Sequence, residues 1–422
     1  MEKVGNFDSM CIEIGLRRIY VMSQALCVLI NSVHMKLCMV VEGYIKPDVA
    51  VKWLNHGFLV LFQGLLSVTG SEKTMLEDTI SAVEALNLYQ IKLLFLEDEL
   101  HSSESGQRQR SSSRESASRS SSGRSSHSSS ANKYDILDVN LVDHYSSMQA
   151  SIKMMQKEKE NKGGAKAGFN FEAMGRGNFS ANEQGKTQIF INGREVIMYI
   201  PREAADLLPS QYKTEMHSKN GLILKVSCIL FSQGIDIQQS LANTFSSGAL
   251  ADTQYLQSDI NMASFAALNR YVKSCIAESG SSVTTDSIHK LCENLFGYLN
   301  GRVVSEKNTD LLLELERICM VLNGCLATFC KSGKDRTGMV ATYRESRLMC
   351  ENYGCGDPNA LEASAVKVSN IFREYGCRLR VCEKNTGKRV YSFNSLQCQF
   401  LPAIYRPPVE VTEDLIKSGD NS

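Results

Sequence analysis

Residues 326–339 read Leu-Ala-Thr-Phe-Cys-Lys-Ser-Gly-Lys-Asp-Arg-Thr-Gly-Met. The apolar run at 326–329 predicts a short buried strand, and the apolar spacing of Met339–Tyr353 predicts a helix. Between them lies a polar turn of the form Cys-x5-Arg-Thr, here called the Cys330 loop (residues 330–337). A turn between a strand and a helix N-terminus directs backbone N–H groups inward, and the helix dipole adds positive potential there. The stretch therefore predicts an α/β domain with an anion-binding turn.

The residue types in the turn point to phosphoryl transfer. Cys330 is the predicted nucleophile, because a positive potential favours the thiolate form of a cysteine. Arg336 is predicted to hold the same phosphate through its planar fork, a geometry that Lys cannot match. Thr337 is expected to hydrogen-bond the Cys330 thiolate. This bond stabilises the thiolate as the leaving group when the phosphocysteine is hydrolysed in the second step. A strand before the turn, a helix after it and Thr337 beside Arg336 make the pattern more specific than Cys-x5-Arg alone.

Four further residues of the Cys330 loop are predicted to bind the substrate: Lys331, Ser332, Gly333 and Lys334. Lys331, Lys334 and Arg336 against Asp335 give the loop a local charge of about +2, which suits a substrate with more than one phosphate. Gly333 allows a positive φ or a close approach of the backbone. The alternative for the two lysines is that one or both point to solvent.

The leaving hydroxyl needs a proton, which calls for an Asp or Glu near the loop. Asp335 is the first choice because it lies in the loop itself. An equally weighted alternative is that Asp335 caps the following helix or orients Arg336. Asp236 and Asp259 are weaker choices from distant parts of the chain.

The Cys330 loop resembles that of the inositol polyphosphate 4-phosphatase family, which reads Cys-Lys-Ser-Ala-Lys-Asp-Arg-Thr. Gly333 replaces that Ala and matches the loop of bacterial invasion-effector phosphoinositide phosphatases. The resemblance covers most of residues 45–408, outside two polar stretches. Other segments that look like the animal enzymes are residues 51–62, Gly234–Leu241, Tyr391–Gln397 and Tyr405–Pro408.

The resemblance implies a cysteine-phosphatase-like fold, a central sheet flanked by helices, and a Mg²⁺-independent enzyme without metal or other cofactor. The implied reaction removes the 4-phosphate of phosphatidylinositol 3,4-bisphosphate and leaves phosphatidylinositol 3-phosphate through a phosphocysteine. The implied partner is a phosphoinositide in a membrane surface, and the implied location is cytoplasmic and peripheral at membranes. The same mechanism on another phosphoinositide, a soluble inositol phosphate or phosphotyrosine stays open, as does a truncated, non-catalytic protein that binds a lipid or a partner.

Full-length animal members carry a lipid-binding C2 domain upstream. No β-rich segment of that kind precedes residue 45 here, so we expect a truncated product, an isoform or a minimal relative.

Composition sets the wider limits. The 422 residues are 43% hydrophobic, enough for a large core, and 46 basic residues balance 46 acidic ones. The zero net charge argues against a nucleic-acid partner. The 14 cysteines lack paired CxxC modules and are consistent with a reducing compartment. No signal peptide opens the chain, and Ile19–Val41 is interrupted by Gln24, Asn31, His34 and Lys36, so it predicts a buried helix or helix pair rather than a transmembrane segment.

Five regions follow from these patterns. Residues 1–100 predict a helical region that packs on the catalytic domain, and the Ser/Arg-rich residues 101–132 predict a disordered linker. Residues 133–187 predict a helix followed by a flexible polar loop. Residues 188–408 predict the catalytic domain, and 409–422 a flexible tail.

The periodicity also predicts individual elements. Val49–Val68 reads as a helix, Ile189–Ile200 as a hairpin around Asn192-Gly193, and Leu222–Phe231 as a strand. The basic segment from Arg373 to Arg389 is predicted to be a solvated strand-turn-strand, with anionic lipid contact as the alternative. Further helices are predicted at Ile237–Thr244, Met262–Ser279, Asp286–Tyr298 and Thr309–Leu322.

Overall fold

A computed structural model describes residues 2–95, 188–200, 205–218, 220–244, 251–277, 282–301, 307–354 and 360–413. These residues divide into two compact units, Met1–Leu93 with Arg202–Ser422, and Leu94–Pro201. The predicted linker at 101–132, the predicted helix and polar loop at 133–187 and the tail from residue 414 lie outside the described residues.

The first unit is built on three parallel strands, β1 (Phe58–Gly64), β6 (Val226–Ser232) and β7 (Cys325–Phe329), in the order β6-β1-β7. All seven residues of β1 are buried. A strand that is paired on both edges and covered on both faces reads as a continuous apolar run, as β1 does. The register places Gly64 beside both Ser232 and Phe329, so the three strands end at one edge of the sheet.

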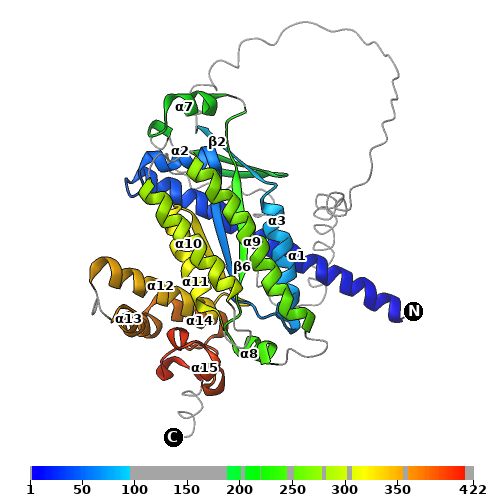
Figure 1. Ribbon diagram of the computed structural model, residues 1–422. Helices are drawn as coiled ribbons and strands as arrows, with labels where there is room; N and C mark the ends of the chain where they lie inside the picture. The colour runs from blue at the N-terminus through cyan, green and yellow to red at the C-terminus, as the bar shows by residue number, and fades with distance from the viewer. Residues whose placement is uncertain are drawn as a thin grey trace. The chain divides into compact units, whose positions relative to one another are not determined.

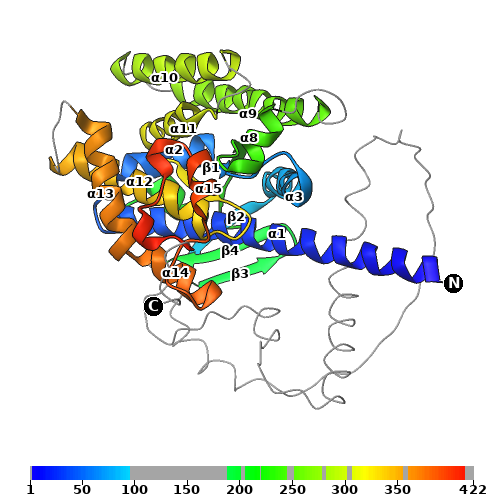
Figure 2. The same cartoon turned by 90° about the horizontal axis from the view of Figure 1, so that it is seen from below.

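Helices cover both faces of this sheet. Figure 2 shows α9, α10 and α11 on one side of β1 and α1 on the other. α9 packs on β6, α11 on β1 and β7, and α1 on β1 and α3. This arrangement confirms the predicted α/β class with a sheet flanked by helices.

The helices have the following bounds (Figure 1): α1 Glu2–Val41, α2 Pro47–His56, α3 Gly70–Leu86, α7 Ser210–His217, α8 Ile237–Thr244, α9 Ala251–Ala277, α10 Ser282–Asn300, α11 Thr309–Val321, α12 Asp335–Tyr353, α13 Leu361–Tyr375, α14 Cys377–Thr386 and α15 Ser395–Phe400, with short 3-10 turns η4 Ala403–Tyr405 and η5 Val409–Val411. The predicted helices at 237–244, 262–279, 286–298 and 309–322 are confirmed, and two of them begin earlier than expected.

The core of the first unit forms where α11 meets the sheet. Leu311, Leu315 and Ile318 are fully or almost fully buried against Leu59 and Phe231 of the strands. Each buried side chain of this size contributes roughly 2 kcal/mol relative to exposure. The spacing i, i+4, i+7 in α11 is the amphipathic pattern that the sequence displays.

The prediction of a helix at Val49–Val68 is wrong. α2 ends at His56, Gly57 has a φ of 94°, and the chain then enters β1. A continuous apolar run does not distinguish a buried strand from a buried helix, because neither periodicity is visible in it. Residues 1–100 are therefore not a purely helical region, since they supply the middle strand of the sheet.

Of two further short elements, one differs from its prediction and the other agrees with it. The predicted strand at 222–231 is split into β5 (Leu222–Leu224), which pairs antiparallel with β2 (Gln90–Phe95), and β6. In the second unit, β3 (Gln188–Asn192) and β4 (Glu195–Ile200) form the predicted antiparallel hairpin. Gly193 turns the chain there with a φ of 58°, which favours glycine.

α1 is one continuous helix of 40 residues. Its segment Cys11–Val41 is long and apolar enough to cross a membrane by length and composition, since it holds an 18-residue window with a mean hydropathy of 1.6, of which 28% is buried. Arg17 and Arg18 both pair with the buried carboxylate of Asp78 on α3. These ion pairs attach α1 to α3 within the first unit.

The predicted strand-turn-strand at 373–389 is also wrong, because α13 and α14 occupy it. Arg373 is fully buried and donates to the carbonyls of Ile404 at 2.8 Å and Arg406 at 2.7 Å. It also donates to Thr342 and to the Met339 carbonyl on α12. Arg373 therefore fastens the C-terminal segment to α12, and it is not available for lipid contact.

Candidate active site

Three loops meet at the C-terminal edge of the parallel sheet. β1 leads into α3, β6 leads into α8, and β7 leads through the Cys330 loop into α12. The strand ladder continues into these loops, since the Leu65 amide donates to the Phe329 carbonyl at 2.9 Å and the Gln233 amide to the Gly64 carbonyl at 2.8 Å. In open α/β sheets this edge is the usual place for a ligand site.

Arg336 is buried in the first turn of α12 and is held by the loop after β1. Its Nη1 donates to Glu72 Oε2 at 2.8 Å and to the Leu65 carbonyl at 2.8 Å, while its Nη2 donates to Glu72 Oε1. Glu72 is itself fixed, because its Oε2 accepts from the Ser67 amide at 2.9 Å. The two-point contact sets the plane and direction of the guanidinium.

Asp236 approaches Arg336 from the loop after β6. Its Oδ2 lies 2.7 Å from Arg336 Nη1, and its Oδ1 accepts from the Gln239 amide at 3.1 Å in the first turn of α8. The arginine is thus held by two carboxylates, Glu72 in the first turn of α3 and Asp236 just before α8.

Burial and charge act in opposite directions on the pKa values of these three groups. Burial alone lowers the pKa of Arg336, but Glu72 and Asp236 outweigh it and raise that pKa. Burial alone raises the pKa of Glu72, and the Arg336 guanidinium reverses the shift and holds it below the usual value. Burial raises the pKa of Asp236, Arg336 opposes this and Glu72 adds to it. Arg336 and Glu72 are therefore a charged pair, with Asp236 as the more easily protonated neighbour.

Cys330 follows the last residue of β7 and is 7% exposed. Its Coulombic interaction with Arg336 is the smallest of the causes that raise the pKa of the guanidinium, so the two groups are electrostatic neighbours. Thr337 is buried, and its Oγ1 has no hydrogen-bond partner among the described residues. The structure thus brings Cys330, Arg336 and Thr337 together at the start of α12.

Asp335 is the first residue of α12 and is held by groups on both of its oxygens. Its Oδ1 accepts from the Ser392 amide at 2.9 Å, and its Oδ2 pairs with Lys334 Nζ. Lys334 is buried and also donates to Ser392 Oγ at 2.7 Å. These contacts fix the Cys330 loop to the segment after α14.

The other loop residues predicted to bind substrate face different surroundings. Lys331 is exposed and its Nζ lies 3.2 Å from Ser71 Oγ on α3. Ser332 is exposed, and Gly333 has a φ of 67°, as its predicted role requires. Asp259 is exposed on α9 and is not among the groups that contact Arg336.

Glu72 and Ser392 were not predicted as site residues. Glu72 follows β1, which the sequence predicts as part of a helix. Without β1 as a strand beside β7, nothing in the sequence indicates that Glu72 lies next to the Cys330 loop. A polar residue soon after a buried strand is the signal that could have revealed it. Ser392 acts through its amide as well as its hydroxyl, and no residue type signals a backbone contact.

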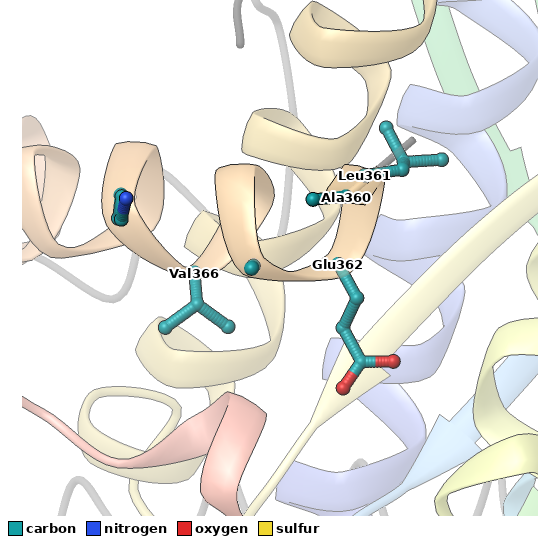
Figure 3. A pocket seen from close by; sticks show the side chains of 6 residues that line it. Ala360, Leu361, Glu362 and Val366 are labelled. Carbon is teal, nitrogen blue, oxygen red and sulfur yellow. The ribbon is translucent and has the colours of Figure 1, made fainter. Parts of the chain in front are cut away.

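A hollow on the first turns of α13 is lined by Ala360, Leu361, Glu362, Ala363, Val366 and Lys367 (Figure 3). None of these residues belongs to the Cys330 loop or contacts Arg336, so this hollow is separate from the candidate site. Among the described residues, no group of three or more His, Cys, Asp or Glu side chains is arranged to hold a metal ion.

The site is thus a Cys-x5-Arg turn at the C-terminal edge of a parallel sheet, with Cys330 and Arg336 both buried. A family model described as the INPP4A C-terminal domain matches residues 187–405, just over half of the chain. The chain belongs to this family, which confirms the resemblance seen in the Cys330 loop.

Three curated relatives carry related names. The human protein named inositol polyphosphate 4-phosphatase type II is 29% identical over 214 residues, which cover 50% of this chain and 21% of that protein. The proteins named type II inositol 3,4-bisphosphate 4-phosphatase from Pongo abelii and Rattus norvegicus are 29% and 28% identical over the same length. The matched part of the chain spans about a fifth of the length of these relatives.

Proposed function

We propose that this chain is a phosphoinositide phosphatase that removes the 4-phosphate of phosphatidylinositol 3,4-bisphosphate. The observation that carries the proposal is the clamped Arg336 beside Cys330 at the N-terminus of α12. The names of the relatives supply the substrate class. The cysteine-phosphatase-like fold, the absence of a metal requirement and a cytoplasmic location at membrane surfaces belong to the same proposal.

The proposed reaction has two steps. The Cys330 thiolate attacks phosphorus, an S–P bond forms, the P–O bond to the ring oxygen breaks, and an acid gives that oxygen a proton. Water then attacks the phosphocysteine and gives a proton to the carboxylate left by the first step, the O–P bond forms as the S–P bond breaks, and inorganic phosphate and the thiolate are released. Arg336 and the amides of the Cys330 loop stabilise the charge on the phosphoryl oxygens in both steps. Thr337, whose buried Oγ1 has no hydrogen-bond partner among the described residues, is the proposed donor to the thiolate.

Asp335 and Asp236 are the two carboxyl groups proposed for the acid. Asp335 adjoins Arg336 in the loop but is engaged by Lys334 and Ser392. Asp236 has a raised pKa, which favours proton donation, and contacts Arg336 directly. The rates of Asp335→Asn and Asp236→Asn on substrates with different leaving groups distinguish these two residues.

The test is phosphate release from each bisphosphorylated phosphoinositide, a soluble inositol phosphate and a phosphotyrosine peptide, with the product identified by chromatography and EDTA present throughout. We expect phosphatidylinositol 3-phosphate from phosphatidylinositol 3,4-bisphosphate, and none from the Cys330→Ser protein. Faster turnover of any other member of the panel would contradict the substrate, and a requirement for added Mg²⁺ would contradict the metal-free mechanism.

A further inference from the structure

Two cationic side chains outside the Cys330 loop meet at the C-terminal end of α15. Arg406 donates through Nε to the Leu401 carbonyl at 2.9 Å and through Nη2 to the Gln399 carbonyl at 3.1 Å. Lys307, just before α11, donates through Nζ to the intervening Phe400 carbonyl. Two cations from parts of the chain about 100 residues apart are thus held on three consecutive carbonyls.

This cation pair adjoins the candidate active site. α15 packs against α8, and α8 begins directly after Asp236. Burial lowers the pKa of Lys307 and the Asp236 carboxylate opposes that shift, so the two charges act on each other, and the same carboxylate contacts Arg336 at 2.7 Å. Asp236 is therefore the shared neighbour of the arginine that is proposed to hold the reacting phosphate and of the lysine beside it.

Within the described part of the chain, the pair has no carboxylate bound to it. Among the described residues, neither Lys307 nor Arg406 forms an ion pair within 4.0 Å. Burial lowers the pKa of Lys307 to about 8, Asp236 opposes the shift, and Arg406 adds to it by repulsion between like charges. Helix-end carbonyls favour one cation, but they carry only about half a charge, which does not balance two.

The loop lysines are less suited to a second phosphate. Lys334 is buried and occupied by Asp335 and Ser392. Lys331 is exposed on the side of α3, where its contact is Ser71. Lys307 and Arg406 lie instead at the end of α15, which packs on α8, and neither has a carboxylate partner in the described part of the chain.

We infer that Lys307 and Arg406 form a second anion subsite, which binds another phosphate monoester of the same substrate molecule while the reacting phosphate lies on the Cys330 loop. The inference rests on the proposed function and extends it, because it assigns the preference for a doubly phosphorylated ring to two named residues. A phosphate dianion placed between them supplies the missing negative charge and two charge-assisted hydrogen bonds.

The test uses the full chain with Lys307→Gln and Arg406→Gln, and with Lys307→Arg as the variant that keeps the charge. Arg380→Gln, an exposed cation on α14, is the matched control. Initial rates are measured on short-chain phosphatidylinositol 3,4-bisphosphate and on short-chain phosphatidylinositol 4-phosphate. We expect each Gln variant to lose roughly tenfold or more of kcat/KM on the bisphosphate beyond its loss on the monophosphate, mainly through KM. Lys307→Arg should recover most of the loss.

A merely structural role gives a different result. If Lys307 and Arg406 only cap α15, the Gln variants lower the thermal midpoint and reduce both substrates by the same factor, and that outcome overturns the inference. If one of Lys307→Gln and Arg406→Gln fails to fold, the other still allows the comparison between the bisphosphate and the monophosphate. Equal rates of all variants and wild type on the bisphosphate also overturn it.

A binding measurement separates failure of the subsite from failure of the proposed function. Calorimetry with the Cys330→Ser protein uses two soluble probes, inositol 1,3,4-trisphosphate and inorganic phosphate, and vesicles containing phosphatidylinositol 3,4-bisphosphate. If wild type hydrolyses no phosphoinositide, the proposed function fails, and a weaker affinity of the Lys307→Gln, Cys330→Ser double variant for the trisphosphate still supports the subsite. Unchanged affinity in the double variant overturns it. Loss on vesicles alone assigns the cations to the lipid surface and also overturns the ring-phosphate subsite.

Discussion

Arg336 and Glu72 form a buried two-point ion pair although 264 residues separate them in the chain. The pair joins the first turn of α3, which follows the central strand β1, to the first turn of α12, which follows the neighbouring strand β7. A guanidinium that binds a phosphate does so more tightly when it is fixed before the substrate arrives. The conformational entropy of its side chain is then lost during folding and not during binding. Glu72 is in this sense a positioning residue for Arg336.

Glu72→Gln is expected to lower both stability and activity. Loss of one partner leaves a buried guanidinium with less compensation, which costs roughly 3 kcal/mol. The pKa of Glu72 lies below 4.5 in the folded chain, so its stabilisation is present above that pH and is lost as the pH falls further. The difference in free energy of unfolding between wild type and variant should therefore be largest above about pH 4.5 and shrink below it.

Urea unfolding across pH measures that difference, and Glu77→Gln, on an exposed position of α3, is the control. A difference that stays constant down to strongly acidic pH would show that the ionised form of Glu72 is not what stabilises the fold.

Arg336→Lys is expected to reduce kcat by a factor of about 10²–10³, because an ammonium keeps the charge but loses the planar fork. Lys at this position can still pair with Glu72, so the thermal midpoint should change little. Steady-state rates and thermal melts of the same preparation check both statements. Arg380→Lys serves as the exposed control, and near-normal kcat in Arg336→Lys would exclude the clamp role.

Cys330→Ser is expected to abolish turnover and to leave the fold intact, since the hydroxyl is close in volume but a poor nucleophile without a base. Rapid acid quench of wild type during turnover should trap protein heavier by one phosphoryl group, on the peptide that contains Cys330. Cys377→Ser, an exposed cysteine on α14, should behave as wild type. Phosphoryl transfer retained in Cys330→Ser would remove the thiol from the mechanism.

The sequence predicts the strand, the turn and the helix around Cys330 well because these features are local. The apolar run, the glycine and the helix periodicity all lie within the 28 residues Leu326–Tyr353. The same is true of the hairpin around Gly193. In each case neighbouring residues decide the backbone conformation, and no distant contact is needed.

The partners of the Cys330 loop could not be predicted, because each depends on tertiary contacts. Glu72 reaches Arg336 only if β1 is recognised as the strand beside β7, and its uniform apolar pattern conceals that. Ser392 reaches Asp335 through a backbone amide, which carries no residue signature. Arg373 reads as a surface cation, and its burial follows from five oxygen acceptors that come together only in the fold.

Arg373→Met is expected to cost roughly 3–5 kcal/mol of stability, because it removes the guanidinium that donates to the Ile404, Arg406 and Met339 carbonyls from a buried position. The C-terminal segment that carries Ser392 and Arg406 should loosen first. Hydrogen exchange of residues 390–411 detects this directly. Arg380→Met is the control, and unchanged protection in Arg373→Met would mean that Arg373 does not fasten the segment.

The identity of the proton donor is decided by comparing Asp335→Asn with Asp236→Asn on substrates with different leaving groups. The ring hydroxyl leaves only with a proton, whereas p-nitrophenolate leaves without one. Removal of the true acid should therefore lower kcat on the phosphoinositide by about 10²–10⁴ and leave p-nitrophenyl phosphate much less affected. Removal of a residue that only positions Arg336 or the Cys330 loop should lower both rates by similar factors.

The contacts of the two residues give the expected assignment. Asp335 is engaged by Lys334 and the Ser392 amide, so its loss should disorder the loop and reduce both substrates alike. Asp236 has its pKa raised by burial, so it holds a proton to higher pH than an ordinary carboxyl group. We expect the selective loss in Asp236→Asn, together with loss of the alkaline limb of the pH–rate profile. A selective loss in Asp335→Asn instead would assign the proton to the loop and leave Asp236 as a holder of Arg336.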